Sequence, residues 1–206
     1  QHREIVYIPM SAGLSASCAT AQVLAEDFEG RVQVVDNRRI SVTQRHSVLD
    51  ALALARQGLD AAETKRILEE QAMDACIYIT VDTLKYLRKG GRVTGVEAVA
   101  GTMLNIKPVM HVDDEGHLIP LEKVRGRKKA MSYLVDKSAE NITHPEDQEV
   151  IILHADAPQD AAKLDEMLKA KVPGVRTRIE CVGPVIGAHC GPGTVAICFL
   201  GKERAV

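Results

Sequence analysis

The sequence predicts an α/β fold of two lobes, a parallel α/β lobe over residues 1–74 and an α/β lobe with a mixed sheet over residues 75–206. In the first third of the chain, short apolar runs alternate with helical patterns, as in parallel β-α-β units. Later, two apolar runs flank Asp113-Asp114-Glu115-Gly116, a short turn that suits an antiparallel hairpin. Helices and strands then alternate again, which favours a two-layer lobe with helices on one face of the sheet.

In the first lobe, Gly30 and Gly58 mark the ends of two predicted helices. Asp60 and Glu63, three residues apart, fit a capping box at the start of a third helix. The expected strands cover residues 5–8, in the manner of a buried parallel strand, and 32–35. The expected helices cover residues 19–28, 44–56 and 61–73.

In the second lobe, Asp82 is the expected cap of a short helix that ends at Gly90-Gly91. Pro173-Gly174 ends the last predicted helix. The expected strands cover residues 76–81, 106–112, 118–124, 150–153, 175–182 and 195–200. The expected helices cover residues 83–89, 127–140 and 161–171.

The composition excludes several classes of protein. A net charge of −2 gives no overall field that attracts nucleic acid, and 3% aromatic residues without Trp disfavour base stacking. No apolar run approaches the roughly 18 residues of a membrane span, and the polar start is not expected to be a signal peptide. Five scattered cysteines without a CxxC pair predict reduced thiols in a cytoplasm and no zinc site. A chain that starts with Gln1 is expected to be a fragment or to lack its natural beginning.

A loop of small and polar residues, 11–17, joins a predicted strand to a predicted helix. Its backbone N–H groups and the hydroxyls of Ser11, Ser15 and Ser17 could bind an anion at the helix N-terminus. The alternative is that Ser15 or Ser17 only caps the helix. The loop is neither GxGxxG nor a P-loop, which disfavours a nucleotide site.

Two further segments are rich in basic residues. In residues 85–92 a solvated helix end explains most of the charge, but Arg92 after two glycines is harder to explain in that way. Residues 122–129 include Arg125 and are either a solvated strand-to-helix junction or a docking patch for an acidic partner or phosphate.

A glycine- and proline-rich stretch over residues 183–193 surrounds His189. Such a stretch can bring backbone close to a ligand and hold one imidazole, which can donate, accept or titrate near neutral pH. The alternative is a tight turn with an exposed histidine.

Taken in order over essentially the whole chain, these segments resemble the DegV family. The motifs that carry the resemblance are Ser11-Ala12-Gly13-Leu14-Ser15, Val35-Asp36, Asp82-Thr83-Leu84 with Tyr86-Leu87 and Gly90-Gly91-Arg92, Leu104-Asn105-Ile106-Lys107-Pro108, Lys123-Val124-Arg125-Gly126, and Gly187-Ala188-His189 with Gly191-Pro192-Gly193.

The resemblance implies a DegV-like protein that buries a long-chain fatty acid between two α/β lobes. Some members are the binding subunit of a fatty acid kinase, in which a separate ATP-binding protein phosphorylates the carboxylate. The chain is therefore expected to be a carrier and not an enzyme, with no cofactor or metal. Transient contact with a membrane surface is left open.

By the same resemblance, residues 11–17 form the carboxylate-binding loop of the first lobe, with Ser15 as first choice beside Ser11 and Ser17. His189 matches the histidine of the second lobe near the carboxylate. Arg125 matches a basic residue linked to kinase docking, and Arg92 matches a motif arginine nearby.

The sequence departs from the family pattern in the loops that approach the expected site. Ala12 and Ala16 cannot help to bind an anion through their side chains, although Ser17 keeps a hydroxyl. The other departures are Asn37 for Ser, the bulkier Arg38, Arg39 and Gln44 in a glycine-bearing segment, and Cys190 for Thr. The family's first strand and two further ligand loops have no counterpart, so the first lobe is expected to be partial and the site incomplete.

Two other functions remain open at the level of sequence. One is a stand-alone enzyme for a small carboxylated or phosphorylated metabolite, with His189 as acid or base. The other is a thiol-based redox protein that uses Cys190, whose pKa a neighbouring imidazolium could lower.

Overall fold

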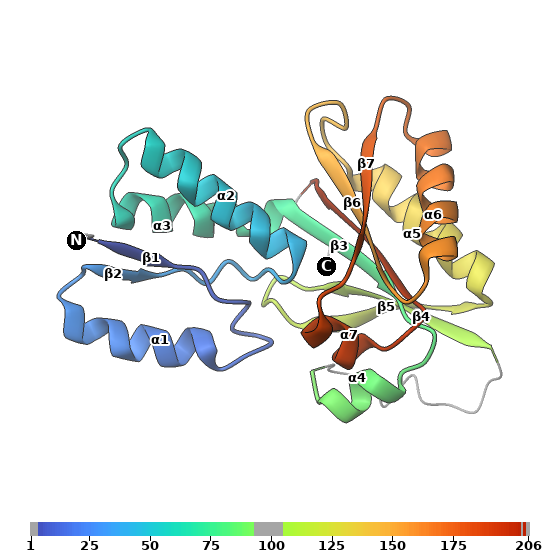
Figure 1. The fold of residues 1–206 in the computed structure, drawn as a ribbon, viewed down its shortest axis with the longest axis horizontal. Helices are drawn as coiled ribbons and strands as arrows, with labels where there is room; N and C mark the ends of the chain where they lie inside the picture. The colour runs from blue at the N-terminus through green and yellow to red at the C-terminus, as the bar shows by residue number, and fades with distance from the viewer. Residues whose placement is uncertain (1–3, 93–104, 203, 205–206) are drawn as a thin grey trace.

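The computed structural model describes residues 4–92, 105–202 and 204, and arranges them around two β-sheets (Figure 1). Gln1 and Leu104, which the sequence analysis cites, lie outside the described residues. A two-stranded sheet belongs to the first part of the chain, and a six-stranded sheet begins at Ala75. The division into lobes at residue 74 coincides with this change of sheet and stays a prediction.

The first part contains a β-α-β unit followed by two helices. β1 (Ile5–Tyr7) and β2 (Val32–Val34) pair in parallel and are joined by α1 (Ser17–Ala25) and the 3-10 turn η1 (Glu26–Phe28). α2 (Val42–Arg56), α3 (Ala61–Glu70) and the 3-10 turn η2 (Ala72–Asp74) follow. The Asp60 carboxylate accepts a hydrogen bond from the Glu63 N–H at 2.8 Å, so the predicted N-cap of α3 is confirmed.

The second part is built on a mixed sheet with the strand order β5-β4-β3-β8-β6-β7. The strands are β3 (Ala75–Thr80), β4 (Ile106–Val112), β5 (Leu118–Arg125), β6 (Glu149–Ala155), β7 (Arg176–Cys181) and β8 (Thr194–Leu200). β6 and β7 are parallel, and the other neighbouring strands are antiparallel. β8, the last strand along the sequence, lies in the middle of the sheet, between β3 and β6.

The two faces of this sheet have different partners. α5 (Arg127–Asn141) and α6 (Pro158–Lys171) cover one face and enclose the largest core cluster. The opposite face meets α4 (Lys85–Gly90), α7 (Pro184–Cys190) and the start of α2 around two smaller clusters. Because side chains alternate along a strand, β8 sends Val195 and Ile197 to the first face and Ala196 to the second.

Some predicted details of the fold are wrong. Helices lie on both faces of the large sheet and not on one, because the start of α2 packs across the second face. β1 is not a buried strand, since Ile5 and Tyr7 are 52% and 44% exposed. Asp82 does not cap α4, because its carboxylate pairs with Lys107, while the Thr83 hydroxyl accepts from the Lys85 N–H at 3.2 Å.

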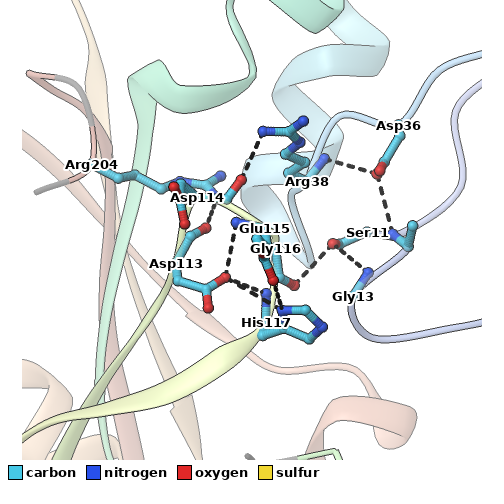
Figure 2. A network of polar contacts seen from close by, with 11 residues as sticks. Ser11, Gly13, Asp36, Arg38, Asp113, Asp114, Glu115, Gly116, His117 and Arg204 are labelled. Atoms are coloured by element: carbon cyan, nitrogen blue, oxygen red, sulfur yellow. Dashed lines mark hydrogen bonds and ion pairs between the residues drawn. The ribbon is translucent and has the colours of Figure 1, made fainter. Parts of the chain in front are cut away.

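The turn between β4 and β5 makes polar contacts with loops of the first part and with Arg204 near the end of the chain (Figure 2). Ser11 donates its hydroxyl to the Gly116 carbonyl at 2.9 Å, and Arg38 donates to the Asp114 carbonyl at 2.8 Å. From the other side, Arg204 donates to the Asp113 carbonyl at 2.9 Å. The bonds from Ser11 and Arg38 hold the loops before α1 and α2 against this turn of the large sheet.

Candidate ligand-binding site

A cavity of about 270 Å³ lies between the second face of the large sheet and the loops of the first part. Its volume is slightly below the range of roughly 300–1,000 Å³ that is usual for small-molecule sites. The sheet supplies an apolar floor of alternate side chains, which are Ile77, Ile79, Met110, Val112, Leu118, Leu153 and Ala196. The first part of the chain adds Met10, Leu14 and Ile40.

Strand periodicity explains why the floor is apolar. Ile77 and Ile79 lie two residues apart on β3 and face the cavity, whereas Tyr78 between them packs into the core under α5 and α6. Met110 and Val112 repeat this pattern on β4. The floor of the cavity is therefore made by the side chains that alternate towards the second face of the sheet.

Polar side chains meet this apolar space at a few points. Ser15 and Ser41 come from the first part, and Arg92, His189 and Thr194 come from the second. The Thr194 hydroxyl is occupied, because it donates to the Cys190 and Gly191 carbonyls at 3.1 and 2.9 Å. The Arg92 guanidinium donates to the Gly90 carbonyl at 2.7 Å and keeps further donors.

The three serines of the 11–17 loop have different positions. Ser15 lines the cavity, and its hydroxyl lies 2.6 Å from that of Ser17 and accepts from the Ser17 N–H at 3.2 Å. Ser17 is exposed at the start of α1 and does not line the cavity. Ser11 is fully buried and is not part of the cavity lining. Its hydroxyl donates to the Gly116 carbonyl and accepts from the Gly13 N–H at 3.1 Å. Of the three, the structure places only Ser15 in the cavity wall.

His189 and Arg92 reach the cavity from two short helices that pack together. α4 ends just before Arg92, and His189 is near the end of α7. These helices lie side by side on the second face of the sheet (Figure 1). Ser15 and His189 therefore lie in the wall of one cavity, although 174 positions separate them in the sequence.

The sequence matches the model of a known family. The family model described as an uncharacterised protein of the DegV family matches residues 1–202. The chain belongs to the DegV family.

Similar sequences and solved structures of DegV proteins align with nearly the full length of this chain. A DegV domain-containing protein of Clostridium perfringens is 34% identical over 205 residues, which cover 97% of this chain and 70% of the relative. The solved structure of a fatty acid binding DegV family protein from Streptococcus agalactiae is 28% identical, with a TM-score of 0.85, and covers 98% of this chain and 71% of that one. The structure of DegV, a fatty acid binding protein from Bacillus subtilis, is 31% identical, with a TM-score of 0.77, over 97% and 71% of the two chains. The DegV-like α/β fold predicted from the sequence is thereby confirmed.

The bulkier residues of this DegV chain are accommodated outside the cavity. Arg39 is 2% exposed and donates to the Ala72 carbonyl at 3.3 Å and to the Ser47 hydroxyl at 3.1 Å. Gln44 donates to the Ile8 carbonyl at 3.0 Å. Both side chains fix the start of α2 and leave the cavity open.

Arg125 does not line the cavity. It is the exposed last residue of β5, whereas Leu118 at the start of that strand contacts the cavity. Seven residues of strand separate the two Cα atoms by about 23 Å. Arg125 therefore belongs to the surface of the DegV fold and cannot contact a ligand at Leu118.

Cys190 lines the cavity, but its thiol is poorly suited to redox chemistry. Burial raises the pKa of Cys190 above the usual value, more than hydrogen bonding to Thr194 lowers it. The thiolate is the reactive form, so this environment suppresses reactivity.

A separate exposed group, His144, Glu146 and Asp147, has potential metal-ligand atoms within 4.8 Å of one another but is not part of the cavity lining.

Sequence reasoning missed Ser41 as a cavity residue. Ser41 has φ 59° and ψ −130°, a conformation that non-glycine residues rarely adopt and that is often retained at functional sites. The available signal was Ser41 followed three residues later by Gln44, the pattern of a capping box, although Ser41 makes no side-chain cap bond.

Among the helices that the structure describes, none is long and apolar enough to cross a bilayer.

Proposed function

We propose that this chain binds a long-chain fatty acid in the cavity and presents its carboxylate to an ATP-binding kinase partner. The observation that carries the proposal is one apolar cavity with Ser15, Arg92 and His189 in its wall, in a chain of the DegV family. The fatty-acid binding stated for the relatives from Streptococcus agalactiae and Bacillus subtilis supports the choice of ligand.

The apolar floor accounts for the acyl chain. Each buried methylene contributes about 0.8 kcal/mol, so a chain of about sixteen carbons gains on the order of 10 kcal/mol before ordering costs are subtracted. Met10 and Met110 can adjust to its shape, because unbranched thioether side chains fill irregular space. A small polar metabolite would gain little from these walls, so the carrier is better supported than a stand-alone enzyme.

The polar residues account for the head group. A buried carboxylate needs donors or a positive charge, which the Ser15 hydroxyl, the His189 imidazole and the Arg92 guanidinium can supply. We assign Ser17 a supporting role through its contact with Ser15, and we assign Ser11 the role of fixing the loop against Gly116. The chain then holds and orients the carboxylate, and the partner supplies the phosphoryl group.

Native mass spectrometry and calorimetric titration with palmitate test the proposal. A co-purified or titrated acid of about sixteen carbons at one site per chain is the expected result. Turnover of a soluble metabolite without lipid binding would support the enzyme instead.

The five free cysteines fit a reducing compartment, so we place the carrier in the cytoplasm.

Ser15→Ala is expected to weaken palmitate binding about tenfold, because it removes one hydrogen bond to a charged head group. The measurement is a calorimetric titration. Ser132→Ala on α5, outside the cavity lining, is the matched control and should bind like the unmodified chain. Equal affinities for the two variants would contradict the assigned role of Ser15.

Arg125→Ala is expected to leave palmitate binding unchanged and to reduce acyl-phosphate formation by the partner kinase about tenfold, since a docking arginine contributes charge-assisted contacts. Arg176→Ala is the control, because Arg176 is also exposed but lies on β7 at the opposite edge of the sheet. Product formation is measured with ATP, palmitate and the partner. A rate equal to that of the control would exclude a docking role for Arg125.

A further inference from the structure

Gly90 and Gly91, at the end of α4, are glycine for two different structural reasons. Gly91 has φ 66°, and a side chain there would meet no heavy atom within 4 Å, so its backbone conformation explains the residue. Gly90 is the last residue of α4 and does not have a positive φ. A glycine within a helix costs about 1 kcal/mol relative to alanine, so Gly90 requires a reason from its surroundings.

That reason is the His189 side chain. A Cβ atom on Gly90 would lie 2.2 Å from His189 Nδ1, 3.1 Å from Cε1 and 3.4 Å from Cγ. The imidazole therefore lies directly against the Gly90 backbone, with Nδ1 towards α4. Nε2, on the other side of Cε1, is the nitrogen left to meet a ligand. Within residues 4–92, 105–202 and 204, no hydrogen bond fixes this ring, so the contact with Gly90 is steric.

Two glycines that follow α7 also allow close contacts with residues in and before α4. A Cβ atom on Gly191 would lie 2.1 Å from the Tyr86 ring, and one on Gly193 would lie 2.8 Å from the Asp82 Cβ. Because α4 is fixed against the segment that ends α7, its last turn has a defined position beside the His189 ring. The bond from Arg92 to the Gly90 carbonyl links the second basic cavity residue to the same point.

We propose that Gly90 is a positioning residue for His189. By carrying no side chain, Gly90 leaves the space that the imidazole occupies and so directs Nε2 towards the ligand carboxylate. This inference rests on the proposed fatty-acid binding. Gly90→Ala would require the imidazole to rotate away, because the Cβ atom and Nδ1 cannot both fit.

A double-mutant cycle with palmitate tests the inference on the full chain. Gly90→Ala and His189→Ala are each expected to weaken binding about tenfold or more, the effect of one lost charge-assisted hydrogen bond. In the double variant the second substitution should add no further loss, because the methyl group added by Gly90→Ala then fits the space that the ring has vacated. Gly187→Ala is the matched control on α7, since its Cβ atom would make only an ordinary 3.7 Å contact with the Val182 side chain, and it should bind like the unmodified chain.

The outcomes separate the two hypotheses. If the unmodified chain does not bind palmitate, the proposed function is wrong and this inference is wrong with it. If the unmodified chain binds palmitate but Gly90→Ala binds equally well, only the positioning role is overturned. Losses that multiply in the double variant would also overturn it, because they would show that Gly90 acts independently of His189. A thermal midpoint for the double variant equal to that of His189→Ala would support it, since it shows that the added methyl group is tolerated once the ring is gone.

Discussion

Ala196→Phe should abolish most of the fatty-acid affinity while leaving the fold intact. Ala196 lies on β8 in the middle of the large sheet, and its small side chain forms part of the cavity floor. A phenyl ring at this position would occupy space needed by roughly four methylenes, which corresponds to about 3 kcal/mol, or an affinity loss of about one hundredfold. Calorimetric titration with palmitate measures the loss.

The same substitution at Ala62 provides the control for Ala196→Phe. Ala62 is exposed on α3 and is not part of the cavity lining, so Ala62→Phe should bind palmitate normally. Thermal unfolding of Ala196→Phe should show an unchanged or raised midpoint, because the ring fills open space instead of displacing packed atoms. Undiminished palmitate binding by Ala196→Phe would show that the acyl chain lies elsewhere.

Gly13→Ala should destabilise the chain by about 3 kcal/mol. A Cβ atom at Gly13 would lie 2.7 Å and 2.8 Å from the carbonyl carbon and oxygen of Gly116 and 2.9 Å from the Glu115 oxygen. All of these are backbone atoms of the β4–β5 turn, which cannot move aside as a side chain could. The clash would also separate the Ser11 hydroxyl from the Gly116 carbonyl and leave buried polar groups unpaired.

Urea unfolding measures this loss of stability from the midpoint at a constant slope. Gly183→Ala is the matched control, because Gly183 has φ −64° and a side chain there would meet no heavy atom within 4 Å. We also expect weaker palmitate binding by Gly13→Ala, since Leu14 and Ser15 in the same loop line the cavity. An unfolding midpoint equal to that of the control would mean that the loop and the turn are not rigidly joined.

The strands and most helices were predictable because their signals are local. Alternating apolar runs, glycine stops and the Asp60 cap act within a few residues, and the structure has the elements close to the expected ranges. α7 was not predicted, because it has only seven residues and Gly187 in its interior disfavours a helix, although Pro184 at its first position is compatible with one. Its stability comes from packing against α4 and the sheet, which is a contact between distant parts of the chain.

The candidate site was only partly predictable for the same reason. Motifs identified Ser15, Arg92 and His189, which the structure places in one cavity wall. The residues of the loop alone do not separate Ser11 from Ser15, whereas the structure buries Ser11 through its bond to Gly116, 105 residues away, and places Ser15 in the cavity wall. The apolar floor could not be assigned before the strand register was known, because the register decides which alternate residues face the cavity.

The central position of β8 has a consequence for biosynthesis. β3 and β6 leave the ribosome well before β8, yet β8 must insert between them to complete the sheet. Until then both strands expose backbone groups and apolar side chains that could pair with other nascent chains. The apolar floor of the cavity, to which Ala196 belongs, therefore cannot form until β8 has been synthesised, and a chain that stalls before residue 194 should be a target for chaperones and proteases.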